Sequence, residues 1–159
     1  MDTELNYKIQ DDNRDDKFIR LFDMNTINKN MSMEEMLSKL SYNDGNNIII
    51  DGKVFKVLLN TSTYNLVMEH LINVTKQAIA HSSPVNIYVS LKSLTLSDLD
   101  KHRDFFLNMI KFFSDNFPNI LNECFLYQTP SIFSQIYKII SIVIDKVTKN
   151  KIHIVKNKK

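Results

Sequence analysis

Residues that cross-link, kink or loosen a chain are scarce in this sequence. Its 159 residues include one cysteine, two glycines, three prolines and no tryptophan. A lone Cys124 excludes a disulfide framework and any multi-cysteine zinc site. Gly45 and Gly52 are too few for a glycine-rich phosphate loop. We therefore expect a protein of a reducing compartment, the cytoplasm, that does not bind nucleotides through such a loop.

Long apolar runs are also missing. One long uncharged and largely apolar stretch, residues 125–137, contains Gln128, Pro130 and Gln135 and is shorter than the roughly 20 apolar residues that a membrane-spanning helix needs. The first 16 residues are polar and acidic, unlike a secretory signal. With 43% hydrophobic residues, a chain of this length buries roughly 70% of its unfolded surface without a metal or disulfide. One domain is the expectation.

Catalytic patterns are absent as well. The four histidines are scattered along the chain and form no pair at metal-binding spacing, at positions His70, His81, His102 and His153. Asp98, Asp100 and Asp104 lie near an expected helix start, where they favour the helix dipole. We find no carboxylate pair arranged for acid–base work. The sequence thus predicts a non-enzymatic protein with no metal and no cofactor.

Charge is nearly balanced overall, at +2, but it is unevenly distributed. Six acidic residues lie within the first 16, and lysines gather at the other end, at Lys146, Lys149, Lys151, Lys156, Lys158 and Lys159. We expect an acidic, weakly ordered leader over residues 1–30 and a domain over 31–159 with a basic tail. The tail either meets phosphates of an anionic surface or is simply solvated, and nucleic acid is not expected. The excess of Lys over Arg reflects an AT-rich genome, such as that of a virus or protist.

The sequence predicts a series of helices and strands that begins near residue 32. Ser32 and Glu35 form a capping box for a helix over 33–41. After residue 45, strand and helix patterns alternate, and Asp51-Gly52 predicts a tight turn between strands over 48–50 and 54–59. Helical periodicity then covers 63–80, 97–116 and 131–147, and strands are expected over 85–91, 124–128 and 151–155. This order is typical of an α/β fold with a mostly parallel sheet and crossover helices.

The helix expected over 131–147 is unusually apolar. One continuous face carries Ile132, Phe133, Ile136, Ile139, Ile140, Val143, Ile144 and Val147. Two interpretations remain open at this point. The segment is either an ordinary buried helix or a movable helix that covers an apolar cavity or dips into a membrane surface.

The same region resembles the CRAL-TRIO lipid-transfer family. The family pattern is matched without a gap by Phe117, Pro118, Pro130, Phe133, Ser134, Asp145, Val147, Thr148, Lys151 and Ile152. Weaker similarity in Asp51-Gly52-Lys53-Val54 and in residues 89–94 extends the resemblance over 48–155. It implies a sheet beneath a hydrophobic pocket covered by a gate helix over 131–147. Compared with the family, the N-terminal helical region is reduced and the C-terminus is truncated.

The resemblance also implies site residues. Lys151 matches the headgroup lysine of phosphatidylinositol-binding members, and Asn119 stands where they carry a glutamate; we add Lys149 to this headgroup set. Phe133, Ile136, Ile139, Ile140 and Val143 would contact acyl chains, and Lys146, Lys156, Lys158 and Lys159 would face a membrane. We expect a peripheral protein at the cytoplasmic membrane face that binds or transfers an anionic phospholipid or phosphoinositide. The alternative is a scaffold like the BCH-type domains, or a homodimerising module, without lipid.

Overall fold

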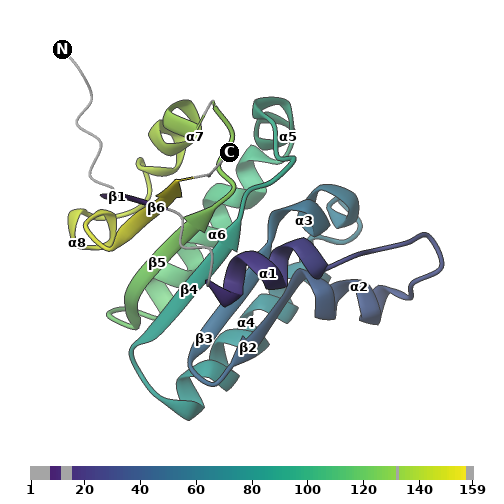
Figure 1. The fold of residues 1–159 in the computed structure, drawn as a ribbon, viewed down its shortest axis with the longest axis horizontal. Coiled ribbons are helices and arrows are strands. Elements are labelled where there is room, and N and C mark those ends of the chain that lie inside the picture. Colours follow the sequence, from purple (N-terminus) through teal and green to yellow (C-terminus); the bar gives the residue numbers. More distant parts are fainter. Residues whose placement is uncertain (1–7, 12–15, 132, 157–159) are drawn as a thin grey trace.

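A six-stranded mixed sheet forms the centre of the protein (Figure 1). The computed structural model describes residues 8–11, 16–131 and 133–156. The strand order is β1-β6-β5-β4-β3-β2, and all neighbours are parallel except β2 and β3. The strands are β1 (Lys8–Asp11), β2 (Ser41–Asp44), β3 (Asn47–Asp51), β4 (Val85–Ser90), β5 (Leu121–Tyr127) and β6 (Ile152–Lys156). The predicted α/β fold with a mostly parallel sheet is confirmed.

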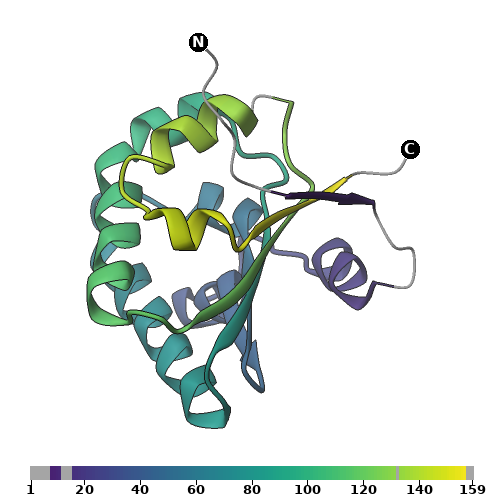
Figure 2. The ribbon, with the colours of Figure 1, turned by 90° about the vertical axis from the view of Figure 1, so that its left-hand side faces the viewer.

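The helices are divided unequally between the two faces of the sheet (Figure 2). The outer face is covered by α1 (Lys17–Met24). The connections between successive parallel strands lie on the other, inner face, as crossovers of one hand require. They contain α3 (Gly52–Leu58), α4 (Tyr64–His81), α5 (Leu96–Lys101), α6 (Arg103–Asn116), α7 (Phe133–Ile140) and α8 (Lys146–Lys149), while α2 (Met33–Leu40) packs beside α3.

Alternation along the strands separates two cores. Ile49 points outward and packs with Phe18 and Phe22 of α1, whereas Ile48 and Ile50 point inward. Side chains of a strand alternate between faces, so three consecutive isoleucines supply both sides of the sheet. The outer core is small because one short helix covers it, and most apolar side chains therefore face inward.

Several predicted elements are confirmed. Ser32 caps α2 as expected, since its Oγ accepts a hydrogen bond from the Glu35 amide (3.1 Å) and the Glu35 carboxylate accepts one from the Ser32 amide (3.0 Å). The helix predicted over 63–80 is α4, and the strand over 85–91 is β4. These segments combine strong periodicity with clear end signals.

The predicted hairpin at Asp51-Gly52 is wrong. Asp51 instead caps α3, because its Oδ1 accepts a hydrogen bond from the Lys53 amide (3.1 Å). The tight turn lies one segment earlier, at Gly45, whose φ of +61° suits a residue without Cβ. Gly52 is needed for another reason: a Cβ there would collide with the carbonyl oxygen of Ser90 on the neighbouring strand.

The two later helices are interrupted. The helix predicted over 97–116 is divided at His102 into α5 and α6, and Thr95 with Asp98 forms its capping box. The gate helix predicted over 131–147 does not extend so far, because α7 ends at Ile140. Asp145 then starts α8 by accepting a hydrogen bond from the Thr148 amide at 2.7 Å. A helix-capping aspartate breaks the continuous apolar face that the sequence suggested.

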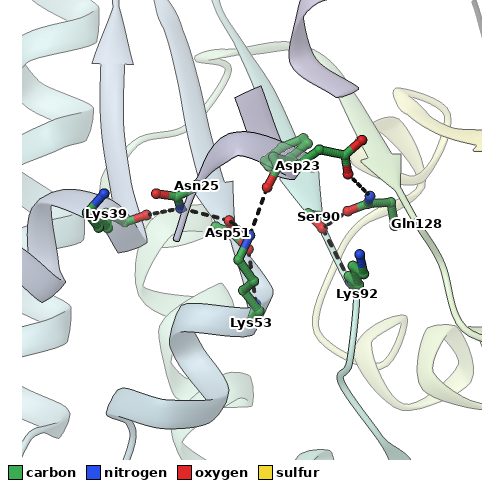
Figure 3. A network of polar contacts seen from close by, with 9 residues as sticks. Asp23, Asn25, Lys39, Asp51, Lys53, Ser90, Lys92 and Gln128 are labelled. Carbon is green, nitrogen blue, oxygen red and sulfur yellow. Dashed lines mark hydrogen bonds and ion pairs between the residues drawn. The ribbon is translucent and has the colours of Figure 1, made fainter. Parts of the chain in front are cut away.

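The segment expected to be a weakly ordered leader is tied to the sheet in its described part. Strand β1 pairs with β6, and Phe22 of α1 is 2% exposed. A polar network also joins α1 to the ends of β3–β5 (Figure 3). Asn25 and Lys53 donate to the buried Asp51 carboxylate at 2.8 and 3.0 Å, and Gln128 donates to Asp23 at 3.0 Å. The expected boundary at residue 30 therefore does not separate α1 from the core.

Candidate functional site

A cavity of about 430 Å³ lies between the inner face of the sheet and the helices that follow β4 and β5. Its floor is made mainly by the inward-pointing side chains of β4, β5 and β6, and β3 contributes at one edge. The residues concerned are Ile87, Val89, Cys124, Leu126 and Ile152, with Ile48 and Ile50 of β3. Its volume is within the range of about 300–1,000 Å³ that is common for small-molecule sites. The floor carries no ionised side chain, so the cavity presents apolar surface to its contents.

Helix α6 forms the roof of this cavity. The lining side chains of α6 are Phe106, Met109, Ile110, Phe113 and Ser114, yet no residue of α6 is buried. An apolar helix face that points at a sheet is normally buried against it. Here the face is only half-buried because the helix stands off the strands, and the space between them is the cavity.

Helix α7 and the segment after it close the side of the cavity. Phe133 and Ile136 are 6% and 7% exposed and line it, together with Tyr137 and Ile140. Phe133 and Tyr137 also pack on Leu126 and Ile152 of the floor. This helix is therefore partly anchored in the core and partly a wall of the cavity.

Polar side chains meet at the end of the cavity where β5 and β6 begin. Asn119, Asp145, Thr148 and Lys151 line this end, which we call the polar rim. The ammonium of Lys151 donates to the Leu121 carbonyl oxygen at 2.7 Å. An ammonium has three donors, and within the described residues this one has a single hydrogen-bond partner, the Leu121 carbonyl. Lys151 is thus able to hold an acceptor group of a ligand.

The polar rim carries charges of both signs. Hydrogen bonds from the Thr148 amide and side chain keep the pKa of the Asp145 carboxyl below its usual range, and Lys151 and Lys149 lower it further. Asp145 is therefore ionised at neutral pH, so the polar rim holds one carboxylate and the Lys151 ammonium, and Lys149 lies outside it.

The structure brings together part of the residue set predicted from the sequence. Lys151 and Asn119 both lie at the polar rim, and Phe133, Ile136 and Ile140 line the cavity. Lys149, Ile139 and Val143 are half-buried near the cavity but do not line it. Of the predicted basic tail, Lys146 is exposed on α8; Lys158, Lys159 and the side chain of Lys156 lie outside the described residues. The roles assigned to all of these residues stay predictions.

Sequence reasoning missed two parts of the site. The periodicity over 97–116 predicted a helix, and nothing in it distinguishes a packed face from one that faces a cavity. Cys124 lines the cavity floor, a position that its neighbours in the sequence do not reveal. Apolar surroundings raise the pKa of the Cys124 thiol to about 12, and the charge of Glu123 adds to this.

Neither a metal site of three or more side chains nor a membrane-spanning helix occurs among the described residues. Within residues 8–11, 16–131 and 133–156, no group of three or more His, Cys, Asp or Glu side chains is placed to hold a metal ion. Among the helices of that same part of the chain, none has the length and apolar character required to cross a bilayer.

Comparisons with known proteins point in one direction. The profile of the CRAL/TRIO domain matches residues 53–159. Among solved structures, the crystal structure of Sfh5 superposes with a TM-score of 0.62 at 12% sequence identity, over 87% of this chain and 56% of that chain. The chain thus spans little more than half of that neighbour, and at this identity the likeness concerns the fold. No curated protein matches significantly.

Proposed function

The chain belongs to the CRAL/TRIO domain family, whose members bind or transfer lipids, and on this premise we propose that it binds an amphiphilic lipid in the cavity beneath α6. The observation that carries the proposal is an apolar cavity of about 430 Å³ with an ammonium group at one end. Transfer of an acyl chain into such a site gains about 0.8 kcal/mol per methylene removed from water. The proposed role is binding or carriage, without catalysis.

The headgroup would lie at the polar rim. A phosphate oxygen is a stronger acceptor than a carbonyl, because charge-assisted hydrogen bonds are shorter and roughly twice as strong as neutral ones. Lys151 would therefore turn from Leu121 to the phosphate, or bind both. Asn119 is exposed beside it and offers an amide to hydroxyl groups of a headgroup. The phosphate of an anionic phospholipid, including that of a phosphoinositide, is the group that this arrangement would bind.

An exposed apolar tip beside the cavity supports contact with a membrane. Ile142, between α7 and α8, is 70% exposed, and Val147 of α8 is 59% exposed. Lys138 and Lys146 are exposed on the same two helices. Apolar side chains among lysines suit the interface of an anionic leaflet, where each basic residue gains about 1 kcal/mol. We propose that this tip touches the cytoplasmic membrane surface while lipid enters or leaves.

Extraction of the purified protein with organic solvent, followed by mass spectrometry, is the first test. A lipid at about one equivalent supports the proposal. Absence of lipid together with a stable dimer would favour the alternative of a protein-interaction module.

A matched pair of lysine variants tests the headgroup assignment. We expect Lys151→Met to weaken binding of an anionic lipid by about tenfold or more, the scale of one charged hydrogen bond, since methionine keeps the apolar stem. Lys149→Met removes the same charge from a side chain that does not line the cavity, and should weaken binding by less than about threefold. Sedimentation with vesicles that contain phosphoinositide should also fall in high salt. Equal effects of the two variants, or binding that ignores lipid charge, would contradict the assignment.

A further inference from the structure

The cavity is too small for a lipid with two chains. We infer that the preferred ligand is a single-chain amphiphile with one anionic group, whose acyl chain fills the cavity and whose charge lies at the polar rim. This inference rests on the proposed function and specifies the class of lipid. Three features support it: the volume of the cavity, the position of its polar groups and the charges of the rim.

Volume sets the number of chains. An apolar cavity of about 150 Å³ holds benzene, which has six carbon atoms. At the same ratio, the 430 Å³ of this cavity hold roughly 17 carbon-sized atoms. This is the size of one common fatty acyl chain. A diacyl phospholipid carries two such chains, so one of them would remain in water or would force the walls apart.

The positions of the polar groups set the direction of the chain. The hydroxyl groups of two threonines in the cavity wall already make hydrogen bonds to residues near them in the chain. The Thr75 hydroxyl donates to the Leu71 carbonyl oxygen (2.8 Å), and the Thr95 hydroxyl accepts from the Asp98 amide (3.1 Å). The ammonium of Lys151 is at the start of β6, and Leu126 on the floor is five residues beyond Leu121. At about 3.3 Å per strand residue, the floor runs for roughly 17 Å away from the rim. One headgroup and one extended chain match this length.

The charge of the rim favours a headgroup with one negative charge. Within the polar rim, Lys151 is the ammonium and Asp145 is the carboxylate, which its lowered pKa keeps ionised. The rim therefore offers one ammonium to one carboxylate or one phosphodiester, and each further negative charge on a headgroup would meet the Asp145 carboxylate. A fatty acid and a monoacyl phospholipid share the required chemistry, which is one chain and one anion.

Binding of matched lipids to the delipidated protein tests this inference. The probes are palmitic acid, a monoacyl phosphatidylglycerol and the corresponding diacyl phosphatidylglycerol, each measured by displacement of a fluorescent fatty acid. We expect at least one of the two monoacyl probes to bind at least tenfold more tightly than the diacyl lipid, with one equivalent bound. The fatty acid and the monoacyl phosphatidylglycerol separate the two sources of the anion. Diacyl binding that equals or exceeds both would overturn the inference but leave the proposed function intact, whereas no binding of any probe would overturn both.

Chain length gives a second readout. A series of fatty acids should bind best near about 16 carbon atoms and more weakly beyond that length, because the cavity is full. Cys124→Phe adds roughly five carbon-sized atoms to the floor and should shift the optimum to a chain shorter by about four or five carbons. Cys124→Ala should leave the optimum within about two carbons of the original. Affinity that rises steadily with chain length in the unmodified protein would contradict a single-chain cavity, even if the phenylalanine variant failed to fold.

Discussion

The two halves of the inner sheet face differ in how closely helices approach the strands. Over β3 and the start of β4, α4 packs directly on the sheet, and Val67 and Ala78 are fully buried. Over β4, β5 and β6, α6 stands off, none of its residues is buried, and about 430 Å³ remain between the helix and the floor. One half of the face is thus mainly an ordinary core, although Leu71 and Thr75 of α4 reach the edge of the cavity, and the other half encloses most of the cavity.

This difference shows what an amphipathic pattern specifies. Both helices carry an apolar face at helical spacing, so both are directed toward the sheet. The pattern does not specify how far the helix lies from the strands. An apolar ligand removes an apolar helix face from water as well as a neighbouring side chain does. In α6, aromatic side chains such as Phe106 and Phe113 provide the wall of such a space.

The largest expected effect comes from adding volume to each half. Ala78→Phe inserts a ring where the side chain is fully buried beside Val74 and Val85. Overpacking of this size should cost about 3 kcal/mol or more of the free energy of unfolding, or prevent folding. Cys124→Phe places the same ring in the cavity and should change that free energy by less than about 1 kcal/mol. Urea unfolding followed by circular dichroism measures both, and equal losses would show that the two halves are packed alike.

Removal of volume should sharpen the comparison with a smaller effect. Val67→Ala leaves a void in the packed half and should cost about 2 kcal/mol. Ile110→Ala removes more carbon, but it only enlarges a space that already exists, so we expect a loss below about 1 kcal/mol. The same unfolding experiment applies, with the protein freed of lipid. A larger loss for Ile110→Ala than for Val67→Ala would break the distinction between the halves.

The sequence predicted the fold better than the ends of its elements. Ser32 with Glu35 and the periodicity of α4 gave correct helices because local hydrogen bonds and one apolar face agreed there. Asp51-Gly52 misled, since an aspartate that precedes a turn and one that caps a helix look identical in sequence. The outcome depended on a tertiary constraint, the close approach of Gly52 to Ser90, which the sequence does not reveal.

The candidate site was predicted unevenly for a similar reason. Lys151 and Asn119 were found through family resemblance, and the structure brings them to one end of the cavity. Asp145 was matched to the family pattern but given no role, because its cap on α8 becomes visible only when the long helix is seen to end at Ile140. The contribution of α6 was missed because the periodicity shows which face of a helix turns toward the sheet but not how far the helix lies from it.

The smallest expected effect is a change in the pH dependence of stability, which reports whether the cavity beneath α6 excludes water. Cys124 is half-buried and lines the cavity, and its pKa is raised from 9.0 to about 12, mainly because its apolar surroundings remove water from the thiolate. A raised folded-state pKa means that the thiol's full contribution to stability is present below pH 9 and is lost as pH rises toward 12. Between pH 8 and pH 10 the unmodified protein should therefore lose about 1.4 kcal/mol more than Cys124→Ala, which has no thiol to ionise.

Urea unfolding of both proteins at the two pH values measures this difference, and the subtraction removes the titration of lysines and tyrosines that both share. Water that filled the cavity would solvate the thiolate and bring its pKa back toward 9.0. The two proteins would then respond alike to pH. Such a result would show that the cavity contains water, because the floor beneath α6 would then behave as solvent-exposed surface. The difference between this half and the packed half beneath α4 would no longer support lipid binding.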